Sequence, residues 1–66
     1  MRGKIKHYNE VKAFGFISPD DGTTDLFFHI SQWQCDGDLP AKGDEVEFTR
    51  GIGRDGRPLA EMVSLS

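Results

Sequence analysis

The chain has 66 residues, a mass of 7.4 kDa and a formal net charge of −3 at pH 7. This length fits one small domain, and a domain of this size leaves a large share of its surface in water. The single cysteine, Cys35, excludes an internal disulfide, and with two histidines it falls short of the ligand set of a structural zinc site. We therefore expect neither a metal ion nor another cofactor.

The sequence contains no segment of the kind associated with export or membrane insertion. No apolar run is long enough to cross a bilayer, and the first ten residues, MRGKIKHYNE, lack the apolar stretch of a secretory signal. A free thiol without an export signal is typical of a reducing compartment. We expect a cytoplasmic protein that makes no contact with a membrane.

The charged residues that give the net negative charge are unevenly distributed along the chain. Residues 1–12 carry four basic side chains against one carboxylate, whereas residues 13–47 carry one lysine against eight carboxylates. The last segment is basic again, with three arginines, Arg50, Arg54 and Arg57. A chain that is acidic overall can present a basic edge, although solvated lysines on a soluble acidic protein would give the same pattern.

Short segments rich in β-branched and aromatic residues alternate with turn-forming residues along the whole chain. The pattern predicts five strands near residues 3–9, 13–18, 25–30, 45–51 and 58–65, with one short helical turn at 31–34. Five short strands at this spacing are typical of a small closed barrel. We predict an all-β fold, a five-stranded antiparallel barrel that forms a single domain over residues 1–66.

The second and third predicted strands are apolar on both faces, which is unusual for a half-buried strand. Successive side chains of a strand point to opposite faces. We assign one face to the barrel interior, with Ile17, Leu26, Phe28, Val46, Phe48 and Val63. The other face then places four rings in water, those of Phe14, Phe16, Phe27 and His29.

Three explanations for this second apolar face are open. It could be buried as in a central strand covered on both sides, but 66 residues leave neither a helix nor a second sheet to cover it. A second copy or a partner protein could cover it, which would make the domain a protein–protein interaction or dimerisation module. A ligand could also cover it, and exposed apolar patches usually mark binding surfaces.

Exposed rings flanked by lysines suit single-stranded nucleic acid. Unpaired bases stack on aromatic side chains, each contact is worth ~1–3 kcal/mol, and stacking needs little sequence match. Because stacking supplies the binding energy, few phosphates need to be neutralised. A binder of this kind can be acidic overall.

Two motifs at short spacing carry a family resemblance. Residues 12–17, KAFGFI, resemble the first ribonucleoprotein motif, and residues 26–30, LFFHI, resemble the second. Their order, their spacing and the all-β pattern resemble the bacterial cold-shock domain over essentially the whole chain. The resemblance implies an OB-type barrel that binds single-stranded RNA and DNA, preferably pyrimidine-rich, as a monomer or a strand-exchanged dimer. It also implies a role as an RNA chaperone or in the regulation of transcription or translation.

The same resemblance implies a set of contact residues. Carried over by position, the nucleic-acid-binding residues are Lys6, His7, Lys12, Phe14, Phe16, Asp25, Phe27, His29, Ile30 and Arg57. The rings would stack on bases, Lys6 and Lys12 would meet phosphates or base edges, and Asp25 would accept a hydrogen bond from a base. Arg57 lies in a glycine-rich turn, where it is either solvated or in contact with the nucleic-acid backbone.

This chain departs from the family pattern at several positions. His7 replaces a stacking tryptophan, Ile30 replaces a phenylalanine of the binding face, and the loop at 35–41 is short and lacks an aromatic residue. Ala13 replaces a glycine, which fits if that position lacks a positive φ. Together these differences predict weaker binding than that of a typical member of the family.

Trp33 has two interpretations. It is either a core residue packed under the barrel or a stacking platform beside the short loop. No catalytic constellation is apparent, because His29 lacks a serine or cysteine partner at a recognisable spacing and Cys35 lies in no nucleophile motif. We do not expect an enzyme.

Overall fold

The strands of the computed structural model are β1 (Arg2–Asn9), β2 (Phe14–Pro19), β3 (Leu26–His29), β4 (Glu45–Ile52) and β5 (Pro58–Leu65), and a 3₁₀ helix, η1 (Ile30–Gln32), follows β3 directly. The structure describes residues 1–35 and 37–66, so Asp36 in the predicted loop at 35–41 lies outside the described residues. Each strand begins and ends within one residue of its predicted bounds. The five-strand prediction is therefore confirmed.

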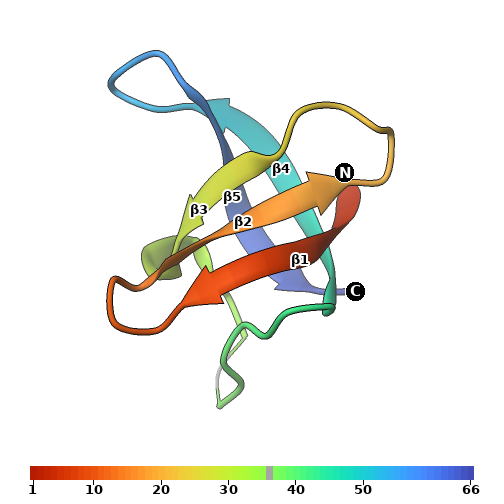
Figure 1. Ribbon diagram of the computed structural model, residues 1–66, viewed down its shortest axis with the longest axis vertical. Coiled ribbons are helices and arrows are strands. Elements are labelled where there is room, and N and C mark those ends of the chain that lie inside the picture. Colours follow the sequence, from red (N-terminus) through yellow and green to blue (C-terminus); the bar gives the residue numbers. More distant parts are fainter. Residues whose placement is uncertain (36) are drawn as a thin grey trace.

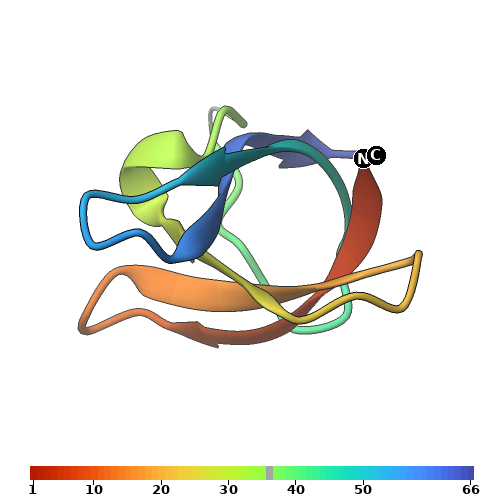
Figure 2. The same cartoon turned by 90° about the horizontal axis from the view of Figure 1, so that it is seen from above.

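The strands form a closed barrel in the order β1-β2-β3-β5-β4 (Figures 1 and 2). The β3–β5 pair is parallel, and the other four pairs are antiparallel. The predicted purely antiparallel sheet is wrong in this respect. An odd number of strands in a closed ring cannot alternate in direction at every step, so at least one neighbouring pair must be parallel.

One hydrophobic core fills the barrel. Its buried residues are Ile5, Ile17, Leu26, Phe28, Val46, Phe48, Ala60 and Val63. The six core residues that alternation predicted are all among them, and Ile5 and Ala60 are additional. Within the described ranges, no helix is long and apolar enough to cross a membrane.

Trp33, the residue directly after η1, packs against this core. Its side chain is half-buried, and the residue forms an isolated parallel bridge with Val63. The indole Nε1 donates a hydrogen bond of 2.7 Å to the carbonyl of Asp38. These contacts agree with the packed interpretation of Trp33 and connect the loop after η1 to the barrel.

A β-bulge in β1 decides which of its residues face the core. Ile5 pairs with Ile17 and His7 pairs with Phe16, which leaves Lys6 as the extra residue. Strict alternation from Ile5 would direct His7 inward and Tyr8 outward. The bulge reverses this, so Tyr8 packs on the core, stacked on Phe28 with 6.0 Å between ring centroids and 16° between ring planes.

A second bulge, in β5, brings Ala60 and Val63 to the same side. Glu47 of β4 pairs with Ser64, and the next pair is Thr49 with Glu61, so β5 holds an extra residue between them. Met62 lies in this bulge with φ of 52°. Because Ala60 and Val63 are three residues apart, only such an insertion allows both to face the interior.

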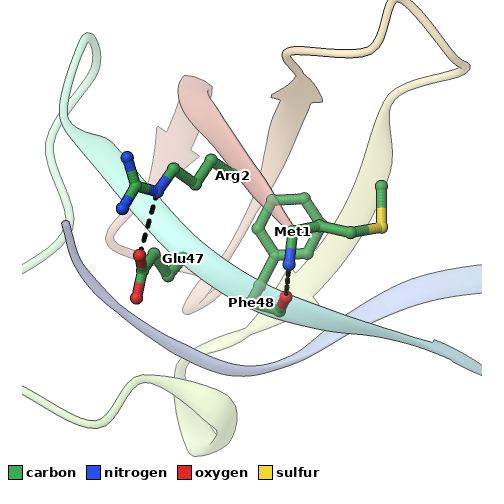
Figure 3. A network of polar contacts seen from close by, with 4 residues as sticks. All are labelled: Met1, Arg2, Glu47 and Phe48. Carbon is green, nitrogen blue, oxygen red and sulfur yellow. Dashed lines mark hydrogen bonds and ion pairs between the residues drawn. The ribbon is translucent and has the colours of Figure 1, made fainter.

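The start of the chain extends the β1–β4 contact that closes the barrel (Figure 3). The Met1 ammonium donates to the Phe48 carbonyl, and the Phe48 amide donates back to the Met1 carbonyl, both at 2.8 Å. On the outside of the same strands, Arg2 Nε donates to Glu47 Oε1 at 2.9 Å. The first residue thus takes part in the pairing of β1 with β4.

The turn between β1 and β2 contains a strained backbone position. Ala13 has φ of 59°, so the condition under which alanine would fit there without strain is not met. An L-residue in the left-handed region costs about 1–2 kcal/mol. The Ala13 carbonyl accepts a hydrogen bond of 2.9 Å from the Ile30 amide, which ties this turn to the start of η1.

We expect Ala13→Gly to raise the free energy of unfolding by about 0.5–1 kcal/mol, because glycine relieves the left-handed strain but loses more entropy on folding. Urea denaturation measures the change. Ala41→Gly is the matched control, since Ala41 is exposed in a loop and is not among the residues with positive φ. Equal or lower stability of Ala13→Gly would show that this backbone conformation is not strained.

Candidate nucleic-acid interface

Three phenylalanine rings lie together on the outside of β2 and β3. Phe14 pairs with His29 and Phe16 pairs with Phe27, and directly opposed residues of a strand pair point to the same side. The ring centroid of Phe27 lies 5.3 Å from that of Phe14 and 6.1 Å from that of Phe16. The His7–Phe16 pair adds an imidazole from β1. We call His7, Phe14, Phe16, Phe27 and His29 the aromatic face.

The rings of this face are accessible to solvent. The two histidines are exposed, Phe16 is 36% exposed, and Phe14 and Phe27 are half-buried. Phe28, between Phe27 and His29 in β3, is completely buried in the core. Alternation along β3 thus separates a core ring from its surface neighbours, as predicted from the sequence.

Gly15 allows β1 and β2 to approach closely beneath the aromatic face. A Cβ atom at this position would clash with the carbonyl oxygen of His7 and would lie 2.9 Å from Cε1 of Phe28. Any side chain would therefore push β2 away from β1 or displace Phe28 from the core. The glycine between Phe14 and Phe16 keeps their strand in place.

His29 holds the end of β3. Its Nδ1 accepts a hydrogen bond of 3.1 Å from the Ser31 amide and caps η1, which fixes the orientation of the ring. Ile30 is half-buried and is the first residue of η1, so it has left β3 and no longer follows the strand alternation. The predicted third strand was one residue too long at this end.

The predicted lysines lie at the border of the aromatic face in different environments. Lys6 Nζ donates to Asp25 Oδ2 at 2.9 Å, and the two side chains are 64% and 33% exposed. An ion pair this exposed adds little stability, but it places the carboxylate of Asp25 beside an ammonium group. Lys12 is exposed in the β1–β2 turn, where its amide donates to Asn9 Oδ1 at 3.1 Å.

A groove of ≈ 670 Å³ continues the aromatic face toward the β4–β5 hairpin. Its lining residues are Phe16, Thr24, Asp25, Phe27, Gly53, Arg54, Asp55, Arg57, Pro58 and Leu59. Arg57 therefore lies near the predicted rings, with its Nε 3.3 Å from Asp55 Oδ2. Sequence analysis missed Pro58 and Leu59, because the parallel pairing of Leu59 with Phe27 has no local signal.

The ten predicted contact residues are distributed over β1, β2, β3, their flanking turns and the β4–β5 hairpin. Three strands and the turn after β1 contribute nine of them, counting Asp25 directly before β3 and Ile30 directly after it, and the β4–β5 hairpin contributes Arg57. The arrangement can present rings to flat ligands, with basic groups at its edges. Ser31 Oγ lies 3.1 Å from His29 Nδ1, the same nitrogen that accepts a hydrogen bond from the Ser31 amide and caps η1.

Comparison with known proteins identifies the family. The model of the 'Cold-shock' DNA-binding domain matches residues 1–66. This chain belongs to the cold-shock DNA-binding domain family. Members of this family generally bind nucleic acids.

Relatives resemble this cold-shock domain along nearly its full length. It is 42% identical to the Cold shock-like protein CspE of Buchnera aphidicola subsp. Acyrthosiphon pisum and 41% identical to CspE of Escherichia coli K12, in each case over 98% of this chain and 96% of the relative. The solved structure "drosophila Unr CSD456" is similar with a TM-score of 0.82 and 29% identity, over 98% of this chain and 26% of the other.

Two phenylalanines of adjacent strands should differ sharply in their contribution to stability. We expect Phe28→Ala to lower the free energy of unfolding by about 3–5 kcal/mol, enough to unfold much of a small domain, because it leaves a cavity in the core. Phe16→Ala should cost about 1 kcal/mol or less, since its ring is already partly in water. Thermal unfolding followed by circular dichroism compares the two, and equal losses would contradict the assignment of faces.

Proposed function

We propose that this cold-shock domain binds single-stranded RNA and DNA by stacking unpaired bases on the aromatic face. The observation that carries the proposal is the group of three phenylalanine rings on the outer surface of β2 and β3, with centroids 5.3–6.1 Å apart. Exposed aromatic rings are platforms for bases, each worth ~1–3 kcal/mol. Burying them in a ligand also removes apolar surface from water.

Single strands are the expected form of the ligand. A duplex keeps its base faces stacked on one another, so a flat aromatic surface can reach them only in unpaired segments. Stacking is tolerant of sequence, and preferences arise from stacking strength and backbone flexibility. We propose pyrimidine-rich strands as preferred ligands, with Asp25 accepting a hydrogen bond from a base edge.

The charges of the interface fit a stacking mode. Lys6 is partly neutralised by Asp25 and Arg57 by Asp55, whereas Lys12 is exposed in the turn after β1. Few phosphates are then neutralised, and a protein with a net charge of −3 can still bind. His7 supplies a smaller ring than the tryptophan of the family pattern and Ile30 supplies none, so binding should be weaker than that of a typical member.

This mode of binding leads to a role for the domain as an RNA chaperone. A protein that binds only the unpaired form of an RNA shifts the equilibrium toward that form by mass action. Weak secondary structures melt first, because they require the least binding free energy. Such melting could regulate transcription or translation, and a monomer with one aromatic face is sufficient for it.

Binding should depend on individual rings of the aromatic face. We expect Phe16→Ala and Phe27→Ala each to weaken the binding of hexathymidine or a U-rich six-nucleotide RNA by ~1–3 kcal/mol, about 5- to 150-fold. Fluorescence anisotropy with a labelled oligonucleotide measures the dissociation constant. Leu65→Ala is the control, since Leu65 is 40% exposed but lies outside the aromatic face. If wild-type protein forms dimers through this face and ignores the oligonucleotide, the domain is a protein–protein module.

The dependence of binding on salt should be shallow. With two or three phosphates neutralised, the slope of log K against log salt concentration is expected at about −1.4 to −2.1 for a single strand. Titrations at several salt concentrations give this slope directly. A slope several times steeper would indicate binding driven by phosphates and would contradict the stacking mode.

A further inference from the structure

An arginine of β4 forms a hydrogen bond to the segment between β2 and β3. Arg50 Nη2 donates a hydrogen bond of 2.9 Å to Thr23 Oγ1, and this hydroxyl donates at 2.7 Å to Asp21 Oδ1. The Thr23 amide also donates to Asp21 Oδ1, at 3.0 Å. These hydrogen bonds to Thr23, with a smaller effect of the Arg50 charge, hold the pKa of the Asp21 carboxyl below its ordinary value. We call these contacts the Arg50–Thr23–Asp21 link.

The link crosses one end of the barrel. Arg50 lies two residues after the buried Phe48 and pairs with the buried Ala60, so its side chain leaves β4 on the inner side. Its exposed guanidinium then reaches Thr23, 27 residues away in sequence. The β2–β3 segment and the β4–β5 hairpin project from this same end of the molecule (Figure 1).

The two segments at this end form opposite parts of the groove lining. Thr24 and Asp25, which directly follow Thr23, line it together with residues 53–55 and 57–59 of the hairpin side. Other contacts hold the two ends of the β2–β3 segment. The Asp20 amide donates a hydrogen bond of 3.0 Å to the Arg2 carbonyl, and Asp25 forms its ion pair with Lys6. Thr23 lies between these ends, where the link supplies the connection to β4.

We propose that Arg50 is a positioning residue for nucleic-acid binding, which acts through Thr23 to hold Thr24 and Asp25 at the groove beside Phe16 and Phe27. This inference rests on the proposed function. Without the link, the middle of the β2–β3 segment loses its connection to β4, and the free energy of ordering it on ligand binding is subtracted from the affinity. Arg50 itself needs no contact with the nucleic acid.

Four variants test the role of the link through hexathymidine binding. Thr23→Val removes the hydroxyl but keeps shape and charge, and Arg50→Gln replaces the guanidinium by a shorter amide and removes one positive charge. Each should weaken binding about three- to tenfold. The double variant should be no weaker than either single variant, because both changes break the same link. Thr23→Ser keeps the hydroxyl and should bind like the wild type.

The matched control is Arg2→Gln. Arg2 is also an exposed arginine with a side-chain hydrogen bond of 2.9 Å, to Glu47 (Figure 3). It is not among the residues that line the groove. Its removal changes the net charge equally, so a long-range charge effect would weaken binding in both arginine variants. We expect Arg2→Gln to change the affinity less than twofold. NMR titration of Asp21 in Thr23→Val should show its pKa rising toward the ordinary value, which tests the Thr23–Asp21 hydrogen bond of the link in solution.

The outcomes separate this inference from the proposed function. If Thr23→Val binds like the wild type while Arg50→Gln binds more weakly with a salt slope shallower by about 0.7, Arg50 contacts a phosphate directly and the inference is overturned. Wild-type affinity in both variants would also overturn it and leave the proposed function standing. Failure of the wild-type protein to bind any oligonucleotide would instead reject the proposed function.

Discussion

A closed barrel has one interior, and this constraint determines what the chain can do. Only one side of each strand reaches the core, which eight buried side chains fill. β2 and β3 nevertheless carry apolar residues on both sides, so Phe14, Phe16 and Phe27 lie at the surface while Phe28 is buried. The core and the proposed binding surface therefore use alternate residues of the same two strands, and the packed core holds the outer rings in place.

A single inserted residue adjusts the border between core and binding surface. The bulge at Lys6 turns Tyr8 into the core and His7 onto the aromatic face. It also leaves Lys6 directed outward, where it meets Asp25 at the edge of the groove. The imidazole at position 7 offers less stacking area than the indole of the family pattern, which is the basis of the weaker binding proposed above.

The sequence predicted the features that depend on local pattern. Turn residues and alternation located the five strands, six core residues and the outward rings of β2 and β3. Features that depend on distant pairing could not be predicted: the parallel contact of Leu59 with Phe27, the bulges, and the hydrogen bond from Arg50 to Thr23. His7 was identified from the family resemblance alone, because simple alternation from Ile5 directs it inward. The positive φ of Ala13 likewise has no signal in the residue type.

The central claim is that the outer rings of β2 and β3 are the surface on which bases stack. The most direct measurement is an NMR titration of the isotope-labelled domain with hexathymidine, following the ring protons of all five phenylalanines. The account predicts large upfield shifts for Phe14, Phe16 and Phe27 and small changes for Phe28 and Phe48, which are buried. Shifts confined to the Arg2–Glu47 side of the barrel, or equal shifts for core and surface rings, would contradict it.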